Sequence, residues 1–150
     1  MSESFKETLN LLKDSDLSDF SKFSSRGIEK ESLRVLDKTI SLTDHPTSLG
    51  STLTNQYITT DFSEALLELI TNKKNSIDES LSELEDVLNF VFKNCSETIW
   101  PSSVPCTIED ENKIRIAEYG SSNSGRLKNL YRKGLSERYG SMMKCVSGIH

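Results

Sequence analysis

The clearest hydrophobic pattern lies between residues 77 and 94. Apolar side chains recur there at alternating steps of four and three, at Ile77, Leu81, Leu84, Leu88 and Val91. This spacing gathers them on one side of an α-helix. Ser76 precedes the run and Glu79 follows three residues later, which is the capping-box pattern of a helix N-terminus. The sequence therefore predicts an amphipathic helix over about 77–94.

Two further helices are predicted, one towards each end of the chain. Ser4 and Glu7 form another capping box, and the helix that begins there runs to about residue 13 with Phe5, Leu9 and Leu12 at helical spacing. In the last third of the chain, a second helix is expected to have Asn123 or Ser124 as its cap and Gly140 as its stop. Its apolar positions are Leu127, Leu130, Tyr131, Leu135 and Tyr139.

Alternating side chains favour a strand at residues 28–35. One face of this strand would carry Glu29, Glu31, Leu33 and Val35, and the other Ile28, Lys30, Ser32 and Arg34. Residues 36–56 contain turn-forming sequences and predict a long connection with little regular structure. Residues 57–71 suit either a helix or a buried strand, because their apolar run fits both patterns. A final strand is expected to begin near Lys144.

Composition and charge limit the class of protein. Hydrophobic residues make up 35% of the chain and charged residues 27%, which is typical of a globular protein. The formal net charge of −5 gives no electrostatic reason to expect a nucleic-acid partner. No apolar run approaches the roughly 20 residues that a membrane-spanning helix needs, and no targeting segment is evident. A cytoplasmic protein with no membrane partner is expected.

The strand at residues 28–35 carries the first candidate chemistry. Residues two apart on a strand share a face and lie roughly 6.5–7 Å apart, so Glu29 and Glu31 are placed to flank neighbouring cations. Such carboxylates suit magnesium, which keeps waters and substrate phosphates among its ligands. The same alternation also fits an ordinary solvated strand face, with Lys30 and Arg34 on the opposite side.

Asp61 and Glu68 give a stronger signal. Glu68 stands between two leucines in the most apolar run of the chain, where an uncompensated carboxylate is costly and a bound cation is a common compensation. The alternative is a helix whose solvated side carries Glu64 and Glu68 at a spacing of four. His150 has no other candidate ligand next to it in the sequence and forms no motif by itself.

Residues 119–132 combine a small-residue turn, a helix N-terminus and two arginines, Arg126 and Arg132. Backbone N–H groups and guanidinium groups there suit an anion such as a carboxylate or a phosphate, although an ordinary helix cap has the same pattern. The three cysteines have irregular spacing and indicate neither a disulfide framework nor a zinc site. Cys106 has no neighbouring His or Lys to activate it and is expected to be inert.

Several short motifs follow one another in a particular order, at Arg26–Val35, Leu49–Ser51, Ile58–Glu68, Trp100–Pro101, Pro105–Cys106, Tyr119–Arg126 and Ser147–His150. In this order they closely resemble the N-terminal part of bacterial glutamate–cysteine ligases of the gamma-proteobacterial type. The likeness covers nearly everything from residue 25 to residue 150. Because several independent motifs carry it, the resemblance is specific.

The resemblance implies an α+β fold, as part of a glutamine-synthetase-like fold: a curved antiparallel sheet with flanking helices, incomplete at the C-terminus. Residues 1–150 would be the N-terminal portion of a single larger catalytic domain. The implied enzyme uses ATP to join the γ-carboxylate of L-glutamate to the amino group of L-cysteine through γ-glutamyl phosphate, in the first step of glutathione biosynthesis. Magnesium, with manganese as a substitute, is the implied metal cofactor.

The same resemblance assigns roles to residues of this sequence. The implied metal ligands are Glu29, Glu31, Asp61, Glu68 and His150. Glu29 and Glu68 are the implied catalytic residues. The implied substrate-binding residues are Arg132 and, around the cysteine side chain, Phe62, Tyr131 and Leu135. The resemblance also favours a strand after Asp61, with Glu64, Leu66 and Glu68 on one face and Ala65, Leu67 and Leu69 on the other.

Family members are several times longer than this chain, and the strand at His150 normally continues in them. The chain is therefore expected to be an N-terminal fragment that cannot synthesise γ-glutamylcysteine alone. The alternative is a non-catalytic remnant that binds a divalent cation, or a polypeptide partner through an uncovered sheet edge.

Overall fold

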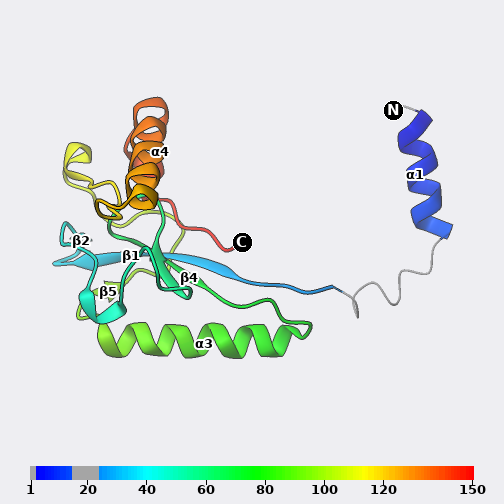
Figure 1. Cartoon of the computed structure of the whole chain (residues 1–150), viewed down its shortest axis with the longest axis horizontal. Coiled ribbons are helices and arrows are strands. Elements are labelled where there is room, and N and C mark those ends of the chain that lie inside the picture. Colours follow the sequence, from blue (N-terminus) through cyan, green and yellow to red (C-terminus); the bar gives the residue numbers. More distant parts are fainter. Residues whose placement is uncertain (1–2, 15–23) are drawn as a thin grey trace.

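The computed structural model describes residues 3–14 and 24–150. Helix α1 (Glu3–Asp14) forms where the apolar spacing predicts it, but it already includes Ser4, so the predicted capping box does not mark its start. An antiparallel sheet lies between two long helices, α3 (Ile77–Asn94) on one side and α4 (Asn123–Tyr139) on the other (Figure 1). The predicted α+β class is confirmed. Within the described ranges, no helix has both the length and the apolar character to cross a membrane.

The sheet consists of β1 (Glu29–Leu36), β2 (Thr39–Ile40), β3 (Ile58–Thr60), β4 (Leu66–Ile70) and β5 (Thr98–Ile99). Its order is β2-β1-β4-β3, β5 also pairs with β1, and every pairing is antiparallel. The last residues of the chain join this sheet, because Lys30 of β1 forms an antiparallel bridge with Ile149. Residues 57–71 thus form strands, which removes the ambiguity of their apolar pattern.

Helix α3 packs on one face of the sheet. A buried cluster joins it to β3 and β4, and the buried residues of this cluster are Leu49, Ile58, Leu67, Leu69, Val87 and Val91. The Ser76 hydroxyl accepts a hydrogen bond from the backbone N–H of Glu79, which confirms the predicted cap. Removal of this apolar area from water is the main force that holds α3 against the sheet.

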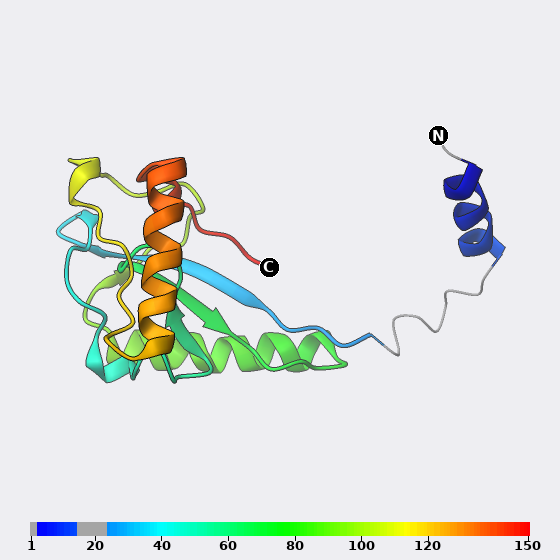
Figure 2. The same cartoon turned by 45° about the horizontal axis from the view of Figure 1, so that its top comes forward.

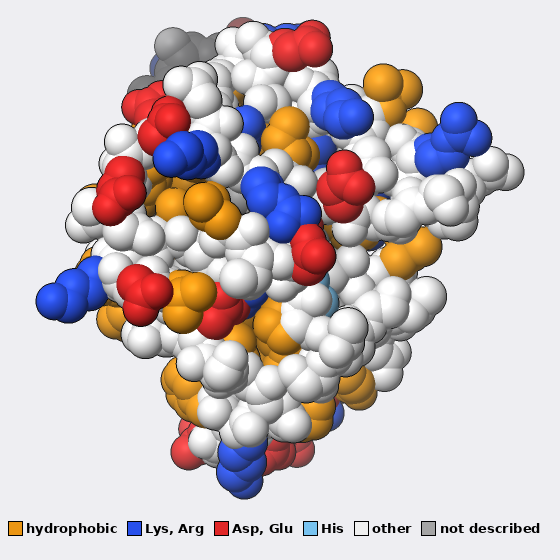
Figure 3. Space-filling model, turned by 90° about the vertical axis from the view of Figure 1, so that its left-hand side faces the viewer, with side chains coloured by type: hydrophobic (Ala, Val, Ile, Leu, Met, Phe, Trp, Pro, Cys, Tyr) orange, Lys and Arg blue, Asp and Glu red, His pale blue; other side chains and the backbone are white. Residues whose placement is uncertain are grey.

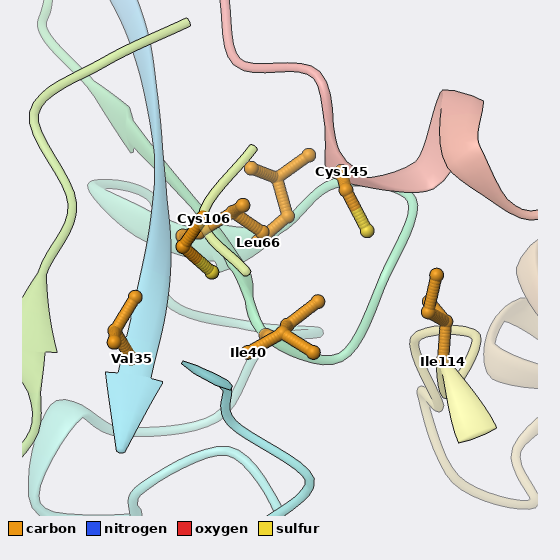
Figure 4. Packing of buried hydrophobic residues seen from close by; sticks show 8 residues of the cluster. Val35, Ile40, Leu66, Cys106, Ile114 and Cys145 are labelled. Atoms are coloured by element: carbon orange, nitrogen blue, oxygen red, sulfur yellow. The ribbon is translucent and has the colours of Figure 1, made fainter. Parts of the chain in front are cut away.

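The opposite face is divided into an apolar half and an acidic half. The apolar half is covered by a second cluster (Figure 4), formed by Leu33, Val35, Ile40, Ala65, Leu66, Cys106, Ile114 and Cys145. Burial raises the pKa of the Cys106 thiol and raises that of Cys145 to about 12. Both thiols are therefore protonated near neutral pH, in agreement with an inert Cys106.

A buried ion pair fixes the part of β1 beyond the acidic half. Arg34 is fully buried and forms a salt bridge with Glu97. Its guanidinium also donates to the Thr43 hydroxyl and to the carbonyl of Glu64. Although burial acts in the opposite direction, hydrogen bonds from Ser41 and Arg34 lower the pKa of Glu97, so the pair stays charged. Arg34 thus belongs to the interior and not to a solvated strand face.

Two further predicted boundaries are wrong. The cap of α4 is Ser122, whose hydroxyl accepts a backbone hydrogen bond, instead of Asn123 or Ser124. The chain forms a 3-10 helix at Met142–Cys145, where the sequence predicts a strand from Lys144. The reason is packing, because the last residue of this turn, a cysteine, is fully buried in the apolar half of the sheet face.

The end of the molecule at which β2 lies has a mixed surface. Acidic and basic side chains are interspersed across it, with hydrophobic side chains between them (Figure 3). A surface of this kind has no patch of one sign, so it offers no electrostatic attraction to a polyanion.

Candidate active site

Acidic side chains gather on the half of the sheet face that the apolar cluster leaves open. In the register of β1 and β4, Glu31 stands directly opposite Glu68, and Thr59 of β3 is the next residue in the same row. Directly opposite residues of antiparallel strands share a face, with Cβ atoms about 4.5–5.5 Å apart. Glu29 lies two residues before Glu31 and shares this face. The helical alternative for Glu68 is therefore wrong.

The electrostatics of these carboxyl groups reflect their proximity. Burial raises the pKa of Glu68 to about 7, and the charges of Asp61, Glu29 and Glu31 act in the same direction. Burial also raises the pKa of Glu31, with a further contribution from the neighbouring Asp61. Like charges that face each other across strands destabilise a sheet. A bound proton or a bound cation therefore favours this arrangement.

The C-terminal residues bring His150 to the same part of the sheet. His150 donates its backbone N–H to the Glu29 carbonyl at 2.8 Å and accepts from the Glu29 N–H at 3.0 Å. Gly148 donates its backbone N–H to the Glu31 carboxylate at 2.7 Å. A Cβ at position 148 would lie 2.6 Å from Nε2 of His150. A larger residue there would push the imidazole away from its place beside the acidic face.

A cavity of about 450 Å³ opens beside these residues. It is lined by Gly27, Ile28, Glu29, Ile70, Thr71, Lys73 and His150. Its volume is in the range of small-molecule sites. Lys73 and Glu29 both line the cavity, and a combination of positive and negative side chains suits an anionic ligand that also carries a metal ion.

Asp61 follows β3 directly and is held through its backbone. Arg132 of α4 donates its Nε–H to the Asp61 carbonyl. The guanidinium carbon of Arg132 lies 4.6 Å from the centre of the Tyr119 ring, a cation–π distance. The Tyr119 hydroxyl donates in turn to the carbonyl of Thr60. This stack holds the end of β3, and with it Asp61, against the acidic face.

Glu64 does not belong to the acidic group. The residue is 5% exposed, and its carboxylate accepts hydrogen bonds from the backbone N–H groups of His45 and Glu118, both at 2.9 Å. It therefore joins two loops that are far apart in the sequence. The predicted common strand face holds only for Leu66 and Glu68, since Glu64 lies before the first residue of β4.

The three residues predicted to surround the cysteine side chain differ in burial. Phe62 is 7% exposed and lies next to Asp61, whereas Tyr131 on α4 is 63% exposed. Leu135, one turn further along the helix, is half-buried. Their common pocket stays a prediction, as does the substrate contact of Arg132.

The donor set fits a hard cation but does not complete a site. Carboxylate oxygens with one imidazole nitrogen are ligands that magnesium and manganese accept. Among residues 3–14 and 24–150, no three acidic, histidine or cysteine side chains converge closely enough to hold one ion. A cation on this face would therefore complete its coordination with water, with substrate oxygens or with groups from outside the described residues.

Three residues of this region could not be given a role from the sequence, although two of them lie within its motifs. Tyr119, Lys73 and Gly148 acquire their roles from partners that are distant along the chain. Only the fold brings these partners together, so no local spacing identifies them.

The fold and the site define an α+β protein with carboxylates gathered on one face of its sheet. The family model described as glutamate-cysteine ligase matches residues 9–150. The chain therefore belongs to the glutamate–cysteine ligase family.

Individual relatives agree with this assignment. The chain is 52% identical over 127 residues to glutamate–cysteine ligase from Yersinia pseudotuberculosis, which corresponds to 83% of this chain and 24% of that protein. It is 50% identical over 127 residues to the enzyme of the same name from Vibrio vulnificus, with the same coverage of 83% and 24%. The chain thus spans about a quarter of the length of these curated relatives.

Solved structures show the same fold. Glutamate–cysteine ligase from Francisella tularensis in complex with AMP superposes with a TM-score of 0.79 at 49% identity, over 83% of this chain and 26% of that chain. A bifunctional glutathione synthetase from Pasteurella multocida superposes with a TM-score of 0.78 at 32% identity, over 93% of this chain and 18% of that chain.

Proposed function

We propose that this chain supplies the acidic part of the active site of a glutamate–cysteine ligase, the first enzyme of glutathione biosynthesis. The observation that carries the proposal is the row in which Glu31 faces Glu68, where burial and neighbouring carboxylates raise the pKa of Glu68 to about 7. Family membership supports the reaction, and the AMP-bound Francisella relative supports the use of a nucleotide. On this proposal, residues 1–150 are one portion of a larger cytoplasmic catalytic domain.

In the proposed reaction, the γ-carboxylate of L-glutamate attacks the γ-phosphorus of ATP. The bond from that phosphorus to the bridging oxygen breaks, ADP leaves, and γ-glutamyl phosphate forms. The amino group of L-cysteine then attacks the acyl carbon, phosphate leaves, and the amine loses a proton. Both steps place negative charge on phosphoryl oxygens. Bound magnesium or manganese supplies neutralisation and alignment of these oxygens.

The residues of this chain would hold the cation and orient the anionic groups. The proposed ligands are Glu29, Glu31, Asp61, Glu68 and His150, and the proposed catalytic residues among them are Glu29 and Glu68. Glu68 is central in this set, because its carboxyl senses the charges of three of the others. Arg132, whose charge acts on Glu68, and Lys73, which lines the cavity beside Glu29, offer positive charge for a substrate carboxylate or a phosphate.

A metal titration tests the ligand assignment directly. Calorimetric titration of the chain with magnesium chloride and manganese chloride is expected to show saturable binding. Glu31→Gln and Glu68→Gln are each expected to weaken this binding at least about tenfold. Glu85→Gln makes the same chemical change at an exposed position of α3 and is expected to leave it unchanged. If Glu31→Gln and Glu68→Gln bind the metal as tightly as Glu85→Gln does, the ligand assignment is overturned.

The chain alone is expected to form no γ-glutamylcysteine. Its matched segment covers 24% of the Yersinia relative, and further groups are needed to complete a cation site. ATP-dependent product above the level of a Glu68→Ala control would contradict this expectation.

A second candidate function is a non-catalytic module that binds a divalent cation or a polypeptide. Among the described residues, β3 ends the strand order of the sheet, and an open strand edge is a ready site for another chain. Cation binding that persists without product formation, even when the remaining ligase polypeptide is supplied, would favour this module.

A further inference from the structure

Another cavity, of about 340 Å³, lies between α3 and the start of β3. Its innermost residues are Ile58 and Val87, which are 2% and 9% exposed. Tyr57 and Phe90 line it nearer the surface. Figure 2 shows α3 lying lengthwise along the strands, with the C-terminus of the chain on their other side. The cavity is therefore separate from the acidic face and from the site described above.

Hydrogen bonds within the chain hold the walls of this cavity in place. The Asn55 side chain accepts the backbone N–H groups of Tyr57 and Ile58. The side chain of Asn72 donates to the Tyr57 hydroxyl at 3.2 Å and to the Glu83 carboxylate at 2.7 Å. Two walls on different elements are thus fixed before anything binds. A preformed site of this kind spares a ligand the entropic cost of ordering it.

Carboxylates border the cavity on the α3 side. Glu83 and Asp86 are three positions apart and lie on the same side of the helix as Phe90. The side-chain hydrogen bond from Asn72 lowers the pKa of Glu83, so this carboxylate is ionised near neutral pH. The ammonium of Lys74 lies 3.7 Å from Glu83, whereas Asp86 forms no ion pair within the part of the chain that the structure describes. The border therefore carries more negative than positive charge.

The charge of the whole helix acts in the same direction. Helix α3 contains five acidic residues and one basic residue among its 18 residues. Such a helix attracts cations and repels anions in its surroundings. The faces of aromatic rings, here those of Tyr57 and Phe90, also attract a cation. An apolar cavity with this border suits a molecule that has an apolar body and a positively charged end.

We propose that this space, the α3–β3 cavity, binds a small organic cation, namely a protonated primary amine on an aromatic or aliphatic body. The body would contact Ile58 and Val87, and the ammonium group would lie next to Asp86. The volume is at the lower end of the range for small-molecule sites. The proposal does not depend on the proposed function, because none of the proposed metal ligands lines this cavity.

Three probes of one shape test the proposal. They are 2-phenylethylamine, 2-phenylethanol and 3-phenylpropionate, which share a phenylethyl body and end in an ammonium, a hydroxyl and a carboxylate group. Each is titrated at pH 7 into the 150-residue chain, and the backbone amide signals are followed by NMR. The amine is expected to bind with a Kd of about 1 mM or lower and at least about fivefold more tightly than the other two. Its largest shifts are expected at residues 55–58 and 83–90.

Two pairs of matched variants locate the binding. Asp86→Asn is expected to weaken amine binding about three- to fivefold, whereas Asp78→Asn removes the same charge from the first turn of α3 and is expected to leave it unchanged. Phe90→Ala is expected to weaken it at least about fivefold. Phe92→Ala makes the same change at a 59% exposed position outside the cavity and is expected to have no effect. Circular dichroism checks that each variant keeps its fold.

Three results would overturn the proposal. One is equal affinity for 2-phenylethylamine and 2-phenylethanol, because the positive charge would then play no part in recognition. Another is an equal loss of affinity in Asp86→Asn and Asp78→Asn, since the helix would then attract the amine only through its overall charge. The third is a set of amine-induced shifts centred on Glu31 and Glu68, which would assign the amine to the acidic face.

The variants also separate this proposal from the proposed function. Glu68→Gln is expected to weaken magnesium binding and to leave amine binding unchanged, and Asp86→Asn is expected to do the reverse. A chain that binds the amine but no magnesium contradicts the proposed function and leaves the α3–β3 cavity as a binding site. A chain that binds magnesium but not the amine contradicts the cavity proposal alone.

Discussion

The two faces of the sheet are built by neighbouring residues of opposite chemistry. Leu67 points into the cluster beneath α3 and is fully buried. Glu68, the next residue, lies on the other face, where burial and nearby carboxylates raise its pKa to about 7. Apolar packing within this chain closes the α3 face. The other face is closed only over its apolar half, around Leu33 and Leu66.

This difference separates stability from function. Burial of apolar area on the α3 face stabilises the sheet, whereas carboxylates opposed across strands destabilise it. Such a conflict with the rules of stable packing is expected at a functional site. Substitutions on the α3 face should therefore unfold the protein, while substitutions on the acidic face should mainly change its response to pH and to cations.

Leu67→Ala is expected to have the largest effect. Leu67 is 0% exposed, and truncation leaves a cavity between β4 and α3, so the free energy of unfolding should fall by about 3–5 kcal/mol. Urea unfolding followed by circular dichroism measures it. Leu81→Ala, at a 51% exposed position of α3, should change stability by no more than about 0.5 kcal/mol. Equal losses in the two variants would mean that this face is not closed by α3.

Gly125→Ala tests how α4 is held on the other side. A Cβ at this position would lie 2.2 Å from the Tyr119 carbonyl oxygen and 2.8 Å from that of Gly120. Backbone atoms cannot yield without a shift of the helix, so stability should fall by about 1–3 kcal/mol. The same shift should move Arg132 away from Asp61 and weaken magnesium binding in a calorimetric titration. Unchanged stability and unchanged binding would contradict this close approach.

The pH dependence of stability tests the acidic face. Because burial raises the folded-state pKa of Glu68 from 4.5 to about 7, the folded protein holds this proton more tightly than the unfolded chain does. The contribution is fully present below pH 4.5 and is lost as the pH rises to about 7. Thermal melts of the Glu68→Gln variant should therefore show a smaller loss of stability over this interval than melts of the original chain.

Magnesium provides the matching control for that experiment. A cation on the acidic face offsets the charge of the deprotonated carboxylates, so excess magnesium should raise the Tm of the original chain at pH 7. The Glu68→Gln variant should gain less. A Glu85→Gln chain, altered at an exposed site on α3, should behave as the original. Identical pH profiles for all three chains would contradict a functional role for the carboxylates of the acidic face.

Local sequence determines the elements that could be predicted. Helix α3 could be predicted from its cap, Ser76, and from apolar positions that repeat over only a few turns. The alternation along β1 likewise predicts that Glu29 and Glu31 share one face. The same alternation does not reveal that Arg34 is buried, because its partner Glu97 is 63 positions away. The cap of α4 was wrong because residues 121–124 are all small and polar, and several of them can act as a cap.

The candidate site was predictable only in part, for the same reason. The apolar run around Glu68 fits a helix or a strand, so the prediction of a strand there depended on resemblance and not on the pattern, and only the fold shows that Glu68 stands opposite Glu31. Tyr119 bonds to Thr60 across 59 positions, and Gly148 bonds to Glu31 across 117. Such contacts exist only after the chain has folded. Spacing along the sequence therefore indicates the carboxylates but not the residues that hold them.

The smallest expected effect is a gain in stability on the outer side of α4. A Cβ at Gly134 meets no atom within 4 Å. Alanine favours a helix interior over glycine by about 0.8–1.0 kcal/mol, so Gly134→Ala should raise the free energy of unfolding by about 0.5–1 kcal/mol in urea titrations, opposite in sign to Gly125→Ala.

The opposite signs of the two glycine substitutions sharpen the comparison between the two sides of α4. A loss of stability in Gly134→Ala, of the same sign as in Gly125→Ala, would mean that the outer side of the helix has no room for a methyl group and is as closely packed as the inner side.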